Sequence, residues 1–174
     1  MVMQIRKLTV ADSAPYKAIR LQALEQYPEA FGSSYEDEKE KSLEDIARML
    51  GAKRHDTDFI VGAFDHGNLV GTVGFFQQTK TKIRHKGLIW GVYVLPEAQG
   101  RGIAYQLMDY AISEAGTIHG LEQIHLSVTA SNTAAVRLYD KLNFTVYGFE
   151  KNAIKFGDRY VDEEHRVLDL VGSL

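Results

Sequence analysis

The chain has 174 residues, a formal net charge of −3 and no cysteine. A chain of this length buries about 70% of its unfolded surface, so we expect one domain over residues 1–174 that needs no disulfide or metal. The negative charge argues against a nucleic-acid partner, and the absence of cysteine excludes disulfides, cysteine-ligated metals and a cysteine nucleophile. The amino terminus has no signal-like apolar core and no run is long enough to span a membrane, so we expect a cytoplasmic protein without a membrane partner.

The first third of the chain predicts a strand and two helices. Residues 4–10 alternate in polarity as a strand does, and Asp12 or Ser13 can cap the helix that follows. Residues 27–42 are polar and acidic, so we expect a loop there that is long enough to act as a lid. A short helix follows over residues 43–51, where a terminal glycine suits the helix end.

The middle of the chain predicts an antiparallel meander. Residues 58–65 and 69–78 have the composition of strands, and the intervening "HGN" is typical of a hairpin turn. Residues 86–94, "KGLIWGVYV", read as a third strand. Three strands in succession indicate neighbours in one sheet.

The last part of the chain predicts two helices and three more strands. The helices cover residues 103–118 and 131–144, and the strands cover residues 122–128, 145–156 and 160–171. The apolar stripe of the first of these helices is suited to packing on a sheet. We therefore expect an α/β (α+β) fold, with a mixed, mostly antiparallel seven-stranded sheet flanked by about four helices.

A glycine-containing turn joins the strand over residues 86–94 to the helix that begins near residue 103. It has the pattern Gln99-x-x-Gly102-x-Ala104. The first turn of a helix has unpaired N–H groups and the positive end of the dipole, and Gly100 and Gly102 leave room for a phosphate. A P-loop is excluded because no Gly-Lys-Ser/Thr follows, and a Rossmann loop fits poorly because the third glycine is missing. The alternative is that the glycines only shape a tight turn.

Two polar residues lie on one face of the helix over residues 131–144. Asn132 and Tyr139 are seven residues apart, which separates them by about 10.5 Å along a helix. They can contact two points of one extended ligand. The alternatives are that Asn132 is a helix cap and that Tyr139 is a core aromatic.

The segments "VYVLPEAQGRGIAYQLM" and "NTAAVRLYDKLNF" resemble the GNAT superfamily of acetyl-coenzyme A dependent N-acetyltransferases, and the likeness covers nearly the whole chain. It implies that acetyl-CoA is the cosubstrate, that an amine is the acceptor, and that two central strands splay apart. The family usually has glycine where Asn143 stands, and asparagine tolerates the same left-handed conformation. The resemblance assigns the pyrophosphate to the backbone amides of Gln99, Gly100, Arg101, Gly102, Ile103, Ala104 and Tyr105.

The resemblance also implies roles in catalysis. Val92, Tyr93 and Val94 would pair with the pantetheine arm, and the Val94 N–H would polarise the thioester carbonyl as an oxyanion-hole donor does. Asn132 would contact the cofactor near the pantetheine. Tyr139 would act as the general acid that protonates the departing thiolate.

The identity of the general base is left open by the sequence. With no cysteine to carry an acetyl group, direct attack by a neutral amine is the simplest route, and the amine must first lose a proton. Many relatives have a glutamate on the strand before the glycine turn, but "GLIWGVYV" contains no acid. Glu36, Asp37 and Glu38 are candidates to line the acceptor site, with a solvated surface as the alternative.

Other titratable and aromatic residues are expected to have structural rather than catalytic roles. The six histidines show no metal spacing, so we expect no metal. His125 reads as a structural histidine on a strand, and Trp90 and Tyr93 can be core residues.

The sequence leaves alternatives for the identity of the acceptor and for the class of function. The tail is similar to relatives that acetylate polyamines or protein amino termini, and Asp162, Glu163 and Glu164 could attract a cation. The expected function is acetyl transfer to a primary amine by a monomer or homodimer. A non-catalytic CoA-binding sensor on the same fold and a dinucleotide-binding module are the alternatives.

Overall fold

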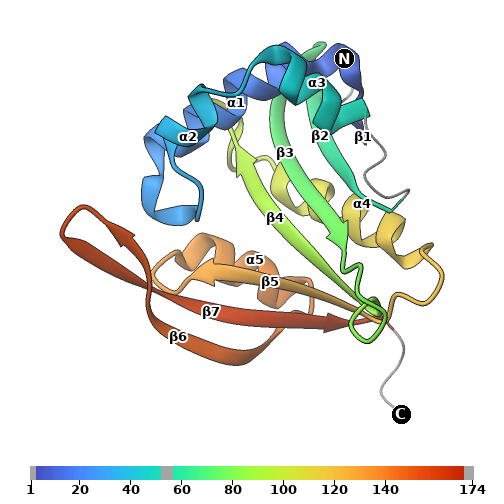
Figure 1. The fold of residues 1–174 in the computed structure, drawn as a ribbon, viewed down its shortest axis with the longest axis vertical. Helices are drawn as coiled ribbons and strands as arrows, with labels where there is room; N and C mark the ends of the chain where they lie inside the picture. Colours follow the sequence, from blue (N-terminus) through green and yellow to red (C-terminus); the bar gives the residue numbers. More distant parts are fainter. Residues whose placement is uncertain (1–2, 52–56, 171–174) are drawn as a thin grey trace.

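The structure, a computed structural model, describes residues 3–51 and 57–170. Over these residues the protein forms a seven-stranded sheet with five α-helices (Figure 1). The strand order is β1-β2-β3-β4-β5-β7-β6, and β4 and β5 are the parallel pair. The strands are β1 (Gln4–Lys7), β2 (Phe59–Asp65), β3 (Asn68–Gln77), β4 (Lys86–Val94), β5 (Gln123–Thr129), β6 (Thr145–Phe156) and β7 (Arg159–Asp169). The helices are α1 (Ser13–Gln26), α2 (Tyr35–Lys39), α3 (Leu43–Gly51), α4 (Ile103–Gly116) and α5 (Thr133–Lys141), with short 3₁₀ turns η1 (Val10–Asp12), η2 (Pro28–Ala30) and η3 (Pro96–Ala98). The predicted mixed, mostly antiparallel sheet is confirmed.

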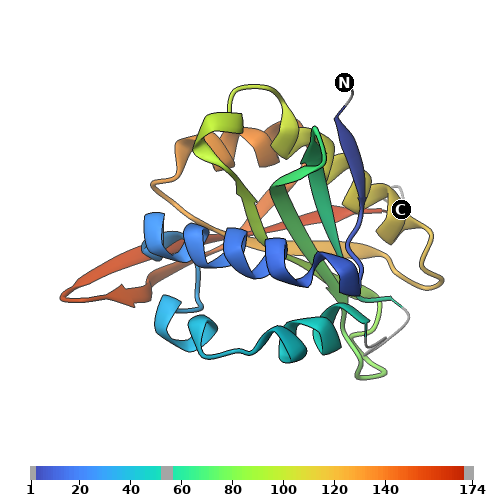
Figure 2. The same ribbon diagram turned by 90° about the horizontal axis from the view of Figure 1, so that it is seen from above.

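Helices cover both faces of the sheet. Figure 2 shows α1, α2 and α3 on one side of the strands and α4 and α5 on the other. Leu107, Met108 and Ala111 of α4 are fully buried, together with Val61 and Val73 of the sheet. Because both faces of β2 and β3 are covered, these strands are apolar almost without interruption. No helix in the described parts of the chain has the length and apolarity needed to cross a bilayer.

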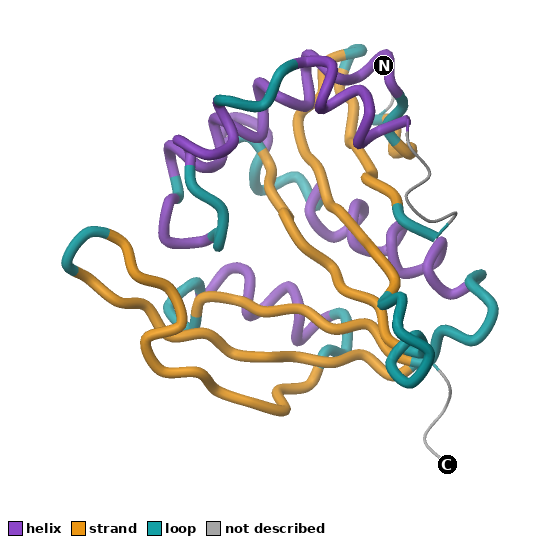
Figure 3. Tube along the Cα trace, viewed as in Figure 1, coloured by secondary structure: helices purple, strands orange, loops and turns teal. Residues whose placement is uncertain are grey.

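The sheet splits between β4 and β5, as the family resemblance implied. The two strands pair only from Lys86 opposite Gln123 to Leu88 opposite His125 and then diverge (Figure 3). A bulge in β4 accompanies the divergence, since the register against β3 shifts between Trp90 and Tyr93. Gly91 lies in this bulge with a φ of 62°, which glycine adopts without strain. A bulge bends its strand, so the end of β4 is directed away from β5.

The predicted loop over residues 27–42 is wrong in part, because it contains η2 and α2. The Ser34 hydroxyl accepts the Asp37 N–H at 3.1 Å and caps α2. Acidic residues in the first turn of α2 also favour a helix, through the positive end of its dipole. The first strand likewise ends at Lys7, because η1 follows it. Val171, the predicted end of the last strand, lies outside the described residues.

The turn at η1 depends on a buried carboxylate. Asp12 is 6% exposed and accepts hydrogen bonds from both terminal nitrogens of Arg6, at 2.8 and 2.9 Å, and from the Thr9 N–H at 2.8 Å. The Arg6 guanidinium lowers the pKa of Asp12 to about 2. A folded-state pKa below the unfolded value stabilises the protein at pH values above the unfolded pKa, here by about 2 kcal/mol. That contribution is lost as the pH falls through about 2.

We therefore expect Asp12→Asn to lower the free energy of unfolding by about 2 kcal/mol at pH 7. The difference from the parent should shrink as the pH falls from about 4 towards 2. Urea unfolding at several pH values measures this difference in the free energy of unfolding. Asp45→Asn is the control, because the Asp45 carboxylate likewise accepts a backbone N–H, that of Ser42 at 3.0 Å, but is exposed. Equal losses for the two variants at pH 7 would contradict the account of η1.

Candidate active site

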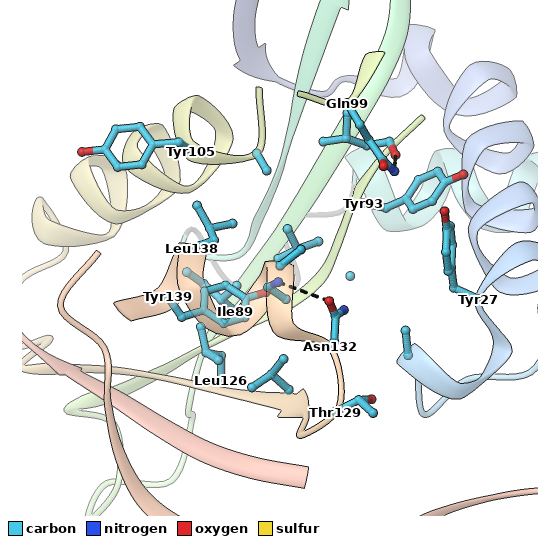
Figure 4. A pocket seen from close by; sticks show the side chains of 18 of the residues that line it. Tyr27, Ile89, Tyr93, Gln99, Tyr105, Leu126, Thr129, Asn132, Leu138 and Tyr139 are labelled. Carbon is cyan, nitrogen blue, oxygen red and sulfur yellow. Dashed lines mark hydrogen bonds between the residues drawn. The ribbon is translucent and has the colours of Figure 1, made fainter. Parts of the chain in front are cut away.

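A cavity of about 550 Å³ lies between the splayed ends of β4 and β5 (Figure 4). Its walls are formed by residues 89–94 of β4, residues 126–129 of β5, the glycine turn with the start of α4, one face of α5, and parts of the segment 27–31. Segments far apart in the sequence therefore meet around one space.

The amino terminus of α4 faces this cavity with unpaired donors. Gly100 and Gly102 both have a φ of 75°, and a Cβ atom on either would have no described atom within 4 Å. The N–H of Gln106 bonds to the Gly102 carbonyl at 3.1 Å, so the N–H groups of residues 103–105 precede the first bond of the helix. Together with the helix dipole, these groups form a site suited to an anion.

Side chains hold the glycine turn in place. The Gln99 amide donates to the Val94 carbonyl at 3.0 Å, which joins the turn to the end of β4 (Figure 4). The Arg101 side chain does not line the cavity, because its guanidinium binds Asp65 at 2.7 Å. This contact lowers the pKa of Asp65. Of the predicted loop residues, Arg101 is therefore the one whose side chain is not brought to the cavity.

A cation near this turn was missed in the sequence. The Lys141 ammonium at the end of α5 lies 4.7 Å from the centre of the Tyr105 ring at the start of α4. The two residues are distant in the sequence and carry no joint motif. The contact joins the end of α5 to the first turn of α4.

The end of β4 has a free edge towards the cavity. Among the described residues, β4 has no strand partner on its β5 side beyond Leu88. The segment Val92, Tyr93 and Val94 lines the cavity. The Tyr93 hydroxyl donates to Gln26 at 2.8 Å and the side chain is 6% exposed, so the Tyr93 ring is a packing group. Burial raises its pKa to about 12.

Asn132 and Tyr139 both lie beside the cavity on α5 (Figure 4). The Asn132 side-chain oxygen accepts the Ala135 N–H at 3.2 Å, so this residue is a helix cap as well as a cavity residue. Tyr139 is 6% exposed and packs edge-on against Phe144. Burial raises the pKa of Tyr139 to about 12, so its hydroxyl carries a proton at neutral pH. Asn143 has a φ of 65°, the left-handed conformation for which asparagine is suited.

The acidic residues predicted for the acceptor site belong to a short helix and do not line this cavity. Glu36, Asp37 and Glu38 are on α2, and none of them lines the cavity. Glu38 forms an ion pair with Lys41 at 2.8 Å, and Asp37 accepts the Ser34 hydroxyl at 2.7 Å. These side chains form local contacts and place negative charge in the first turn of α2.

The acidic tail residues separate into different environments. Asp162 accepts the Asn152 N–H at 2.8 Å, and Glu164 binds Arg166 at 2.7 Å. Burial raises the pKa of Glu163. His125 is bonded to neighbouring side chains and does not line the cavity.

Two hydroxyl groups at the cavity were missed in the sequence. Ser127 and Thr129 of β5 line it. The Thr129 hydroxyl donates to the Glu29 carbonyl of η2 at 3.0 Å, and the Ser127 hydroxyl lies 2.8 Å from Nδ1 of His165. Strand pairing with β7 brings Ser127 to a residue 38 positions later. No local motif marks such a pair.

Similar proteins of known sequence are acetyltransferases. A mycothiol acetyltransferase of Gordonia bronchialis is 31% identical over 140 residues, which cover 80% of this chain and 42% of that protein. A spermidine N(1)-acetyltransferase of Vibrio cholerae is 27% identical over 129 residues, or 72% of each chain. The chain thus spans less than half the length of the mycothiol acetyltransferase that it matches.

Solved structures share the fold over almost the whole chain. An acetyltransferase of the GNAT family from Streptococcus pneumoniae superposes with a TM-score of 0.87 at 21% identity, covering 97% of this chain and 99% of that one. The yncA protein of Salmonella typhimurium, solved with its cofactor acetyl-CoA, gives 0.85 at 21% identity over 99% and 96% of the two chains. Residues 17–144 match the family described as Acetyltransferase (GNAT), which confirms the resemblance found in the sequence. The chain therefore belongs to the GNAT acetyltransferase family.

Proposed function

We propose that this protein transfers an acetyl group from acetyl-CoA directly to a primary amine, on a small molecule such as a polyamine or on a protein amino terminus. The observation that carries the proposal is the meeting of three features in one cavity: the unpaired amino terminus of α4, the free edge of β4, and Tyr139. These features suit the phosphates, the amide-containing arm and the thioester of acetyl-CoA, in that order.

The residues of the cavity have distinct roles in this proposal. The N–H groups at the start of α4 bind the pyrophosphate, and residues 92–94 pair with the pantetheine amides. The Val94 N–H donates to the thioester carbonyl and stabilises the negative charge that develops as the amine attacks. Asn132 contacts the pantetheine region. Tyr139 gives its proton to the sulfur as the carbon–sulfur bond breaks.

The relatives favour an amine acceptor. The Vibrio cholerae relative is named for spermidine, and the chain covers 72% of it. A structural neighbour from Brucella melitensis, with a TM-score of 0.82, is named as a ribosomal-protein-alanine N-acetyltransferase. We propose the common chemistry of these acceptors, a primary amine, as the substrate class.

Cofactor binding is expected to stabilise the fold. A ligand that binds only the native state contributes RT ln(1 + [L]/Kd), which is about 2.7 kcal/mol at a hundredfold excess over Kd. For a domain of this size, acetyl-CoA should raise Tm by about 5 to 10 °C. NAD and FAD serve as controls, because a dinucleotide site would respond to them. The absence of a shift at millimolar acetyl-CoA would contradict the proposal.

Acetyl transfer is tested by release of free CoA thiol with a panel of polyamines, aminoglycosides, amino acids and peptides with free amino termini. We expect at least one amine to be acetylated, with mass spectrometry showing the acetyl group on nitrogen. Binding of acetyl-CoA without transfer to any amine would instead favour a non-catalytic CoA-binding module.

A further inference from the structure

A hydrogen-bonded chain of three side chains leads from the cavity to the exposed face of β7 and β6. Ser127 lies at the cavity wall, and its Oγ is 2.8 Å from Nδ1 of His165. Nε2 of His165 is 3.0 Å from Oε2 of Glu150. The Glu150 side chain is 56% exposed and that of His165 is 27% exposed. The chain therefore connects the cavity wall with solvent.

The sheet register places these residues on the face that α5 does not cover. Ser127 and His165 stand directly opposite each other on β5 and β7. The next residue of β7, Arg166, points to the other face, where it binds Asp140 of α5. Gly148 of β6 stands opposite His165 and lies in van der Waals range of its imidazole ring.

The chemistry of the end groups gives the hydrogen bonds a direction. An ionised Glu150 carboxylate can only accept, so Nε2 of His165 must be the donor. In neutral histidine the other nitrogen is then the acceptor, so the Ser127 hydroxyl donates to Nδ1. The lone pairs of the Ser127 oxygen are left for a donor in the cavity. An ammonium group is such a donor.

Resting on the acetyl-transfer function proposed above, we propose that Ser127 and His165 form the proton relay that deprotonates the acceptor amine. Ser127 Oγ takes a proton from the acceptor nitrogen and gives its own proton to Nδ1 of His165. The freed nitrogen lone pair forms the bond to the acetyl carbon, and the attacking nitrogen then loses its second proton to water. The carbon–sulfur bond breaks, and the sulfur takes the Tyr139 proton. His165 then loses one proton to water, and Tyr139 regains one from water. The net products are the acetylated amine, CoA thiol and one released proton.

Two acidic side chains lie beside the His165 ring. Glu150 of β6 bonds to its ring, and oxygen atoms of Glu150 and Glu163 and the ring nitrogen of His165 all lie within 4.8 Å of one another. Tyr147 of β6 lies 6.1 Å away between ring centres, and His125 of β5 bonds to Tyr147 rather than to His165. Glu150 therefore orients the imidazole ring, with Nε2 directed at its carboxylate. The relay also supplies the base that β4 lacks.

The first test needs no acceptor. Nitrogen-15 NMR of the histidine side chains, in the full chain with and without acetyl-CoA, reports which ring nitrogen of neutral His165 carries the proton. We expect the Nε2–H form, with Nδ1 unprotonated, and His165→Gln assigns the signal. An Nδ1–H form would overturn the relay, because Ser127 could then no longer pass a proton to that nitrogen.

The second test is the pH dependence of kcat/KM, measured with spermidine and with an alanine-initiated peptide as acceptor probes. The parent should reach its plateau at a lower pH than variants that lack the relay. At pH 7, Ser127→Ala and His165→Gln should lower kcat/KM at least about tenfold, with little change in acetyl-CoA affinity. Their rates should instead rise with pH towards the pKa of the probe amine, where the amine arrives already neutral. Ser127→Thr, which keeps the hydroxyl, should restore most of the parental profile.

His125→Gln is the matched control, because it removes an imidazole from the neighbouring position on the same face without touching the relay. It should leave the profile unchanged. A constant loss at every pH in His165→Gln would show a structural role and overturn the relay. A parent that binds acetyl-CoA but acetylates neither these probes nor the wider amine panel contradicts the proposed function, while the NMR result independently supports or overturns the hydrogen-bond direction.

Discussion

Replacing Tyr139 with phenylalanine should lower kcat for acetyl transfer by roughly ten to a thousandfold, the range expected when a general acid is lost and water replaces it in part. The aromatic ring stays, so the packing against Phe144 and the position of α5 should be preserved. Burial raises the pKa of Tyr139 to about 12, so the hydroxyl is a proton donor throughout the neutral range. The acetyl-CoA affinity should change little, because the hydroxyl acts on charge that develops late in the reaction.

The measurement is steady-state kinetics with an acetylated amine, combined with calorimetry for acetyl-CoA binding. Tyr110→Phe is the control, since Tyr110 packs against the core from α4 and does not line the cavity. It should retain the parental kcat. If chemistry limits the rate and Tyr139→Phe still turns over like the parent, Tyr139 is a packing residue and another group protonates the thiolate.

Gly102→Ala should weaken acetyl-CoA binding about tenfold or more, because the added methyl group would enter the space in front of the helix donors. That space is open, with no described atom within 4 Å of the position that the new Cβ atom would take. The variant should also lose about 1 kcal/mol of stability, because the φ of 75° is unfavourable for a residue with a Cβ atom. Both effects arise from the same conformation, so a control must separate them.

Gly120→Ala provides that control. Gly120 has a φ of 78° and equally open surroundings, but it lies after α4 and away from the cavity. It should lose a similar amount of stability and keep the parental acetyl-CoA affinity. Calorimetry and thermal unfolding of the two variants measure both quantities. Equal affinities for Gly102→Ala, Gly120→Ala and the parent would locate the pyrophosphate somewhere other than the amino terminus of α4.

The sequence by itself was sufficient for most of the fold. Apolar periodicity marked the seven strands and the amphipathic α4, because burial against a sheet requires an apolar stripe at helical spacing. The glycine turn also predicted a helix end open to an anion, since Gly100 and Gly102 reflect a local backbone requirement. Local signals for α2 are present as well, in the Ser34 cap and the acidic first turn, but the polar composition of residues 27–42 by itself predicts only a loop.

Only the tertiary structure decided which residues surround the cavity. The acids of α2 had the charge expected of an acceptor site, yet none of them lines the cavity. Ser127, His165 and Glu150 come together because β5, β7 and β6 pair in a particular register, and a shift of one residue would turn each side chain to the opposite face. The sequence thus determines the secondary-structure elements and the glycine turn, because both depend on residues that are neighbours in the chain. The neighbours of Ser127 depend on strand pairing between distant segments, which cannot be read from the sequence pattern of either segment alone.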